Sequence, residues 1–120
     1  KKVKLEIENF IYQRLPDAFQ AVYKKLNNPQ VVIYDVPLLF EKNMEGMFDV
    51  TVLVYAPRKI QQARLMTRDG HTEAMANSIL DQQMDIEEKK EKAEFVIDNS
   101  RTEAELVVGI EAFLHQYFDQ

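Results

Sequence analysis

The chain has 120 residues, 46% hydrophobic and 29% charged, and its 20 acidic against 15 basic side chains give a net charge of −5. This size predicts one ordinary soluble domain. The negative charge argues against a broad nucleic-acid-binding surface, because such a surface needs clustered Lys and Arg. The absence of cysteine excludes disulfides and thiolate chemistry and favours a reducing, cytoplasmic setting.

Glycine is scarce, with only Gly46, Gly70 and Gly109 in the whole chain. They cannot assemble G-x-G-x-x-G or G-x-x-x-x-G-K-[ST], so these 120 residues hold no glycine-rich phosphate loop. The longest uninterrupted apolar runs, residues 31–34 and 52–56, are far shorter than the ~20 residues that a membrane span needs. We therefore expect neither a membrane span nor a signal peptide.

In chain order, the first predicted element is a helix. Apolar residues between positions 3 and 11 fall four and three residues apart, as they do along one side of a helix. Pro16 predicts an interruption, because a proline inside a helix loses a hydrogen bond and clashes with the preceding turn. The pattern resumes beyond Pro16, and Asn27-Asn28-Pro29 predicts a closing turn.

Beyond residue 30, short apolar runs alternate with helical stretches, which is the pattern of a parallel α/β sheet. Helices are predicted from Pro57 to about Gly70, from the caps Thr72 and Asp85, and over residues 102–118. Three short strands are predicted at residues 31–36, 51–56 and 95–97.

Charged residues at two places point to nucleotide chemistry. Asp35 ends the first predicted strand, at the edge where α/β folds bind ligands. It can reach Mg²⁺ there, directly or through water, or simply cap the next segment. Arg64 and Arg68 lie one helical turn apart, so both guanidinium groups leave the same face. Such a pair suits a polyphosphate, and the alternative is a solvated helix face.

Two further segments have both a functional and a purely structural interpretation. Residues 67–92 are polar and helical, and two short helices joined near Met84-Asp85 fit a mobile lid that excludes water. Much of this run also fits a solvated helix face. Asp98-Asn99-Ser100 follows the last strand and predicts a turn. The Asn99 carboxamide could alternatively bind a base edge.

Four segments, in this order, resemble the bacterial dephospho-CoA kinase family: DVPLLFE from Asp35, RLMTRD from Arg64, QMDIEEK from Gln83 and VIDNS from Val96. The resemblance implies a P-loop kinase fold of the nucleoside-monophosphate-kinase type, with a parallel sheet, flanking helices and a helical lid. It also implies that MgATP phosphorylates the ribose 3′-hydroxyl of dephospho-CoA, the last step of coenzyme A synthesis.

The resemblance assigns roles on the ATP side residue by residue. Arg64 and Arg68 match the arginines that open the lid, where they would meet ATP phosphates or stack on adenine. Asn99 matches the asparagine beside the adenine. Gln83 and Lys89 match further lid positions.

The acceptor side and the metal are assigned in the same way. Asp35 is the position that would reach Mg²⁺ through water, with the ion entering as MgATP. The chain is divided into a helical acceptor-side tail at 1–28, a core at 29–66 and 94–120, and a lid at 67–93. The segment lining the acceptor side matches Pro37, Leu38, Leu39, Phe40 and Glu41.

The chain also departs from the family, whose members begin with a strand, a G-x-x-x-x-G-K-[ST] loop, a helix and an aspartate that serves as catalytic base. None of these parts occurs within residues 1–120. We therefore expect the base and the P-loop lysine in a missing amino-terminal segment of the same enzyme, no catalytic residue here, and no kinase activity from this chain alone. A sheet lacking its central neighbours would also favour self-association.

The expected ligands are ATP and dephospho-CoA, and neither nucleic acid nor a membrane is an expected partner. Two alternatives stay open. The chain can be a fragment of another small-molecule or nucleoside monophosphate kinase, or a non-catalytic α/β scaffold module.

Overall fold

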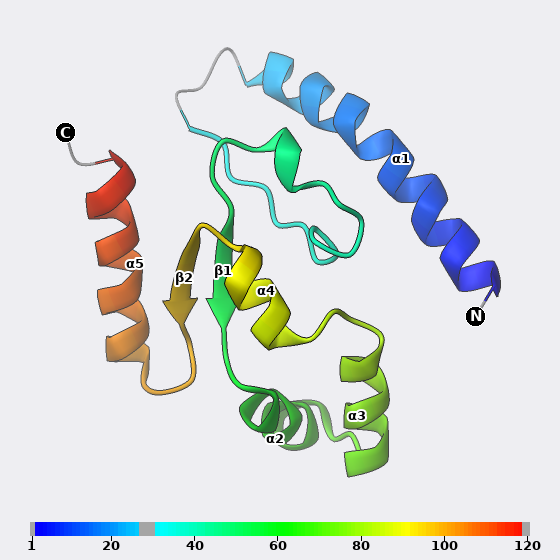
Figure 1. Ribbon diagram of the computed structural model, residues 1–120, viewed down its shortest axis with the longest axis vertical. Coiled ribbons are helices and arrows are strands. Elements are labelled where there is room, and N and C mark those ends of the chain that lie inside the picture. Colours follow the sequence, from blue (N-terminus) through cyan, green and yellow to red (C-terminus); the bar gives the residue numbers. More distant parts are fainter. Residues whose placement is uncertain (1, 27–30, 119–120) are drawn as a thin grey trace.

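The computed structural model describes residues 2–26 and 31–118 (Figure 1). The turn predicted at residues 27–29 lies outside these ranges. From residue 52 on, the predicted alternation of strands and helices is confirmed. The elements are α1 (Lys2–Lys25), the 3₁₀ turn η1 (Glu45–Met47), β1 (Val52–Tyr55), α2 (Arg58–Asp69), α3 (Glu73–Asp81), α4 (Ile86–Lys92), β2 (Phe95–Asp98) and α5 (Glu103–Phe118).

The sheet consists of β1 and β2, which run parallel with Tyr55 opposite Asp98. Hydrogen bonds from Phe95 N to Thr51 O (3.1 Å) and from Asn99 N to Tyr55 O (2.7 Å) extend the pairing at both ends. α5 packs against β2 and α4 against β1 (Figure 1). The carboxyl ends of the strands therefore lead directly into α2 and into the loop that starts at Asn99.

Residues 31–36 form no strand, so the described residues give two strands where three were predicted. Exposed and half-buried side chains alternate along this segment. Tyr34 packs on Phe19 of α1 with 4.2 Å between the ring centres, while Ile33 is 84% exposed. A strand needs a hydrogen-bonded strand beside it, and this segment is covered by a helix on one side only. Its apolar run therefore reflects one-sided packing.

Helix α1 continues through Pro16, so the predicted interruption is wrong. A proline inside a helix costs about 3 kcal/mol, and contacts on both sides of Pro16 offset part of this cost. Before the proline, Tyr12 Oη accepts a hydrogen bond from Leu38 N (3.2 Å). After it, Tyr34 Oη donates to Phe19 O (3.0 Å). Tertiary packing thus holds together a helix that its own sequence would break.

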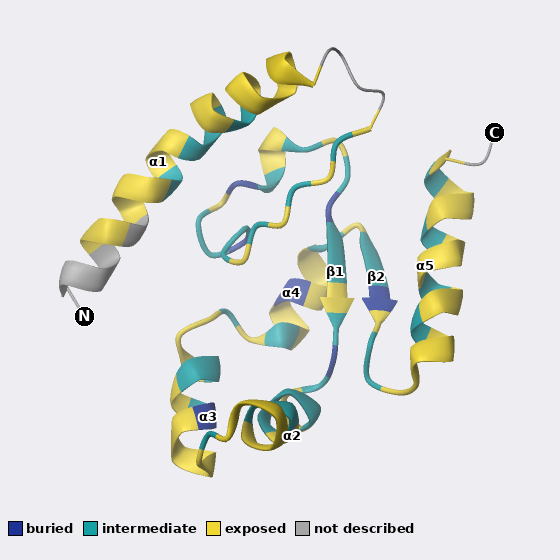
Figure 2. Cartoon of the chain, turned by 180° about the vertical axis from the view of Figure 1, so that it is seen from behind, coloured by how far each residue is buried: buried dark blue, intermediate teal, exposed yellow. Residues whose placement is uncertain are grey.

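Most of α1 is exposed (Figure 2), and some of its exposed residues are large and apolar. Ile7, Phe10 and Ile11 are each at least half exposed, so the predicted helical spacing is confirmed but this stripe faces away from the core. The guanidinium carbon of Arg14 lies 3.6 Å from the centre of the Phe10 ring and covers part of it. None of the helices in the described ranges is both long and apolar enough to cross a membrane.

The core lies around the sheet and beside α3, not along α1 (Figure 2). Its members come from the segment after residue 36, the end of β1, α3 and β2. The buried apolar residues in the described ranges are Phe40, Met44, Ala56, Ala76 and Ile97.

Gly70 ends α2 in the left-handed backbone region, with φ of 71°. We expect Gly70→Ala to lower the free energy of unfolding by about 1 kcal/mol, because a Cβ is unfavourable in this region. The added Cβ would meet no atom within 4 Å, so urea denaturation would measure the backbone effect alone. Gly46→Ala, also in open space but without a positive φ, is the control. Equal unfolding midpoints for Gly70→Ala and the parent chain would contradict this prediction.

Candidate functional site

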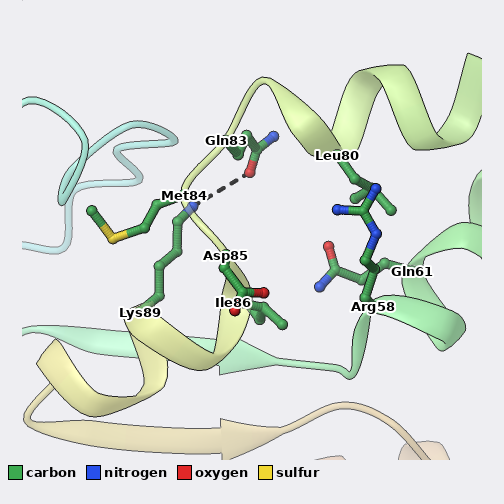
Figure 3. Close-up of a pocket in the computed structure, with 8 residues that line it drawn as sticks. All are labelled: Arg58, Gln61, Leu80, Gln83, Met84, Asp85, Ile86 and Lys89. Carbon is green, nitrogen blue, oxygen red and sulfur yellow. Dashed lines mark hydrogen bonds between the residues drawn. The ribbon is translucent and has the colours of Figure 1, made fainter.

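Two adjoining hollows lie between α2, α3 and the loop that leads into α4. The first, drawn in Figure 3, is lined by Arg58, Gln61, Leu80, Gln83, Met84, Asp85, Ile86 and Lys89. The second, which we call the arginine cavity, has a volume of about 230 Å³ and is lined by Gln61, Arg64, Leu65, Arg68, Ile79, Leu80 and Gln83. The two hollows share Gln61, Leu80 and Gln83, which form the wall between them.

Arg64 and Arg68 lie on the same face of α2, as their spacing predicts, and both line the arginine cavity. Arg68 is mostly exposed and binds the neighbouring Asp69 carboxylate through Nε (2.8 Å) and one terminal nitrogen (3.1 Å). This hydrogen-bonded contact raises the pKa of Arg68 and lowers the pKa of Asp69. Exposed ion pairs contribute about 0–1 kcal/mol. A multiply charged anion entering the cavity can therefore displace Asp69 from Arg68.

Arg58 and Gln61 also line the first hollow, although no role was predicted for them. A terminal nitrogen of Arg58 lies 2.7 Å from Asp81 Oδ1, and Gln62 Nε2 donates to Asn77 Oδ1 (2.9 Å). These contacts join α2 to α3. Positions 58, 61, 65 and 68 follow helical spacing, so the signal that places them on one side of α2 was present in the sequence.

Glu41 and Lys89, which the resemblance assigns to opposite substrates, form a buried ion pair. Lys89 Nζ lies 3.0 Å from Glu41 Oε2, and their side chains are 8% and 16% exposed. The same Glu41 oxygen accepts a hydrogen bond from Met84 N (2.9 Å). Lys89 Nζ also donates to Gln83 Oε1 (3.4 Å), drawn as the dashed line in Figure 3. The pair therefore ties the segment after residue 36 to α4 and to the loop before it.

Helix α4 is held to the sheet by a second set of contacts. Tyr55 Oη donates a hydrogen bond to Glu87 Oε2 (2.7 Å), which raises the pKa of Tyr55. Lys90 Nζ lies over the same ring, 4.4 Å from its centre. Within residues 67–93, α4 is thus fastened to β1 while α3 is fastened to α2. The division of the chain into a tail, a core and a lid stays a prediction.

The remaining acceptor-side candidates and Asp35 line neither hollow. Phe40 is buried in the core, Leu38 and Leu39 are half-buried, and Pro37 is exposed. Asp35 is exposed as well. Among the described residues, no three His, Cys, Asp or Glu side chains gather where they could share a metal ion. A single carboxylate fits Mg²⁺ only when substrate phosphates supply most of its other ligands.

Asn99 lies at the carboxyl end of β2, outside both hollows. The predicted turn is confirmed, because Ser100 N donates to Asp98 Oδ1 (2.8 Å) and the Ser100 hydroxyl donates to the same oxygen. Asn99 is half-buried, and its own N–H continues the pairing with β1. Turn formation thus accounts for the backbone here and leaves a role for the Asn99 carboxamide as a prediction.

The Ser100 hydroxyl, more than its backbone N–H, lowers the pKa of Asp98. We expect Ser100→Ala to raise this pKa toward the ordinary aspartate value of about 3.9. A lowered pKa stabilises the fold above the unfolded-state value, and this contribution is lost as the pH falls through the folded-state value. An NMR titration of the Asp98 carboxyl carbon measures the shift, with exposed Ser78→Ala as control. An unchanged pKa in Ser100→Ala would contradict the prediction.

Comparison with known proteins finds a matching family model and relatives described as dephospho-CoA kinases. A family model described as dephospho-CoA kinase matches residues 1–105. Dephospho-CoA kinases of Enterococcus faecalis and Helicobacter pylori are 41% and 35% identical to the chain over 86 and 111 residues, or 72% and 90% of the chain. The chain covers only 43% and 57% of these two proteins. The crystallised Thermus thermophilus protein TT1252 matches 92% of the chain and 60% of its own length, with a TM-score of 0.70 and 28% identity.

Proposed function

The chain belongs to the dephospho-CoA kinase family, and from that premise we propose that it forms part of an enzyme that phosphorylates the ribose 3′-hydroxyl of dephospho-CoA with MgATP. Within that enzyme, of the P-loop kinase type, the chain would supply ATP-side and acceptor-side residues. The chain spans about half the length of its relatives. The proposal therefore concerns the reaction of the whole protein.

The observation that carries the proposal is the arginine cavity. Arg64 and Arg68 come from α2, and Gln83 comes from the loop beyond α3, yet all three line one hollow. Two guanidinium groups and a carboxamide can together donate hydrogen bonds to several oxygens of a triphosphate. Leu65 and Ile79 supply the apolar part of the same lining.

The other assigned residues complete the proposal. Mg²⁺ would arrive with ATP, and Asp35 would reach it through water. Asn99 would lie beside the adenine. The segment 37–41 would line the acceptor side, with Phe40 and Glu41 acting from the interior, since both are largely buried.

Calorimetric titration of MgATP into the 120-residue chain tests the arginine cavity. We expect Arg68→Ala to weaken binding by about tenfold or more, because a hydrogen bond to a charged group contributes roughly 1.5–3 kcal/mol. Arg101→Ala is the matched control, since Arg101 is exposed and lies 3.7 Å from Glu105 on α5, outside both hollows. Equal dissociation constants for the parent chain and Arg68→Ala would contradict the proposed phosphate role.

A turnover assay tests the chain's competence alone. Phosphoryl transfer depends on backbone donors and a lysine that cradle the phosphates, and no G-x-x-x-x-G-K-[ST] occurs in these 120 residues. We therefore expect no coenzyme A above the no-enzyme control, and measurable turnover would overturn this expectation.

Competition between dephospho-CoA and AMP in the whole enzyme separates the proposed acceptor from that of a nucleoside monophosphate kinase. A scaffold module would bind neither.

A further inference from the structure

We infer that the buried Glu41–Lys89 pair positions Gln83 as a hydrogen-bond donor to an anion in the arginine cavity. Glu41 and Lys89 are then positioning residues that act through Gln83 without touching the ligand. This inference rests on the proposed function of the arginine cavity as the site for a polyphosphate such as MgATP.

The position of Lys89 is the first step. Its side chain is 8% exposed, and its ammonium group lies 3.0 Å from Glu41 Oε2. A buried ammonium group needs a charged partner to offset the loss of water, and Glu41 supplies it. Lys89 does not line the arginine cavity. Lys89 therefore does not directly contact a phosphate bound in the arginine cavity.

The orientation of Gln83 is the second step. Lys89 Nζ lies 3.4 Å from Gln83 Oε1. An ammonium group only donates hydrogen bonds, so it can face the oxygen of the carboxamide but not its nitrogen. The Gln83 nitrogen must then point away from Lys89, as Figure 3 shows. Gln83 also lines the arginine cavity, so this nitrogen is the donor that we assign to an anion bound there.

The backbone beside Gln83 is held by the same carboxylate. Glu41 Oε2 accepts the N–H of Met84 at 2.9 Å. One oxygen atom therefore fixes both the residue that orients the Gln83 side chain and the peptide that follows Gln83. This arrangement preorganises the donor before a ligand binds, which reduces the ordering cost of binding.

The double variant E41L/K89M tests the inference in the 120-residue chain. It removes both charges, keeps the net charge at −5, and replaces the side chains with apolar ones of similar length. Replacing a buried ion pair in this way is often neutral for stability, so we expect a melting temperature close to that of the parent chain. The control E88L/K92M makes the same substitutions at exposed positions of α4.

We expect E41L/K89M to bind MgATP about tenfold more weakly than the parent chain, as Gln83→Leu would, because each loses one preorganised donor to an anion. Exchange of the Met84 amide hydrogen, followed by NMR, should become about tenfold faster at unchanged global stability. If the pair were purely structural, E41L/K89M would bind MgATP with the affinity of the parent chain, because its stability should be unchanged.

The outcomes separate this inference from the proposed function. If Arg68→Ala weakens MgATP binding but E41L/K89M binds within about twofold of the parent chain, the inference is wrong and the proposed function stands. If the parent chain binds no MgATP, the proposed phosphate role fails. Exchange of the Met84 amide hydrogen then tests whether the ion pair positions the loop. Faster exchange in E41L/K89M alone then supports the positioning of the loop, and unchanged exchange overturns it.

Discussion

Lys89→Met is expected to lower the free energy of unfolding by about 3 kcal/mol, because removing one partner of a buried ion pair leaves the other charge without compensation. The carboxylate left behind belongs to Glu41, whose side chain is 16% exposed. Its second oxygen, Oε1, is already buried without a hydrogen-bond partner in the described structure. Urea denaturation of the 120-residue chain measures the loss.

The control for this prediction is Lys92→Met, which makes the same change at an exposed position of the same helix. It should alter the free energy of unfolding by less than about 0.5 kcal/mol. A double-mutant cycle with Glu41→Leu should show strong coupling, since the double variant loses both charges together. Additive effects of the two single substitutions would show that the ion pair does not form.

Phe40→Ala is expected to lower the free energy of unfolding by about 3 kcal/mol, through lost burial and the cavity that the ring leaves. Phe40 is 4% exposed and lies next to Glu41, which is joined to α4 by its ion pair with Lys89. Its loss should therefore loosen the Glu41–Lys89 pair as well. Thermal unfolding followed by circular dichroism would record the change.

Phe10→Ala is the matched control for Phe40→Ala. Phe10 is 58% exposed, and Arg14 lies over its ring. We expect a loss below about 1 kcal/mol, since little apolar surface returns to water and an exposed cation–π contact contributes about 0.5–1 kcal/mol. Equal losses for the two phenylalanines would contradict the position of the core described above.

Local sequence patterns correctly predict the helices and strands from residue 52 onward. The helical period and the caps place α2 to α5 within a residue or two, and Thr72 accepts a hydrogen bond from Met75 N as expected of a cap. The apolar runs place β1 and β2. The bounds of these elements are set by residues close together in the sequence, so they can be predicted from the sequence alone.

Tertiary contacts decide the two elements that were predicted wrongly. Residues 31–36 have a strand-like composition, but a strand forms only by hydrogen bonding to a neighbouring strand. In the structure this segment packs against α1 instead. Pro16 breaks an isolated helix, yet contacts from the segment 34–38 hold α1 together on both sides of it. Neither partner can be identified from the local pattern.

The candidate site shows the same division. Arg64 and Arg68 are one turn apart, so their spacing places both on one face of α2, and the structure shows that this face lines the arginine cavity. The contact between Glu41 and Lys89 joins residues far apart in the sequence, and no periodicity relates them. The resemblance to a family identifies both residues as important. Only the structure shows that they contact one another.

The most direct test of the account is an NMR titration of the 120-residue chain with MgATP, following the arginine side-chain Nε–H resonances. If the arginine cavity binds the phosphates, the resonances of Arg64 and Arg68, which line it, shift saturably, and the resonance of Arg101, in the loop before α5, does not shift. The absence of any shift at Arg64 and Arg68, or equal shifts at Arg101, would contradict the assignment of the arginine cavity as the phosphate site.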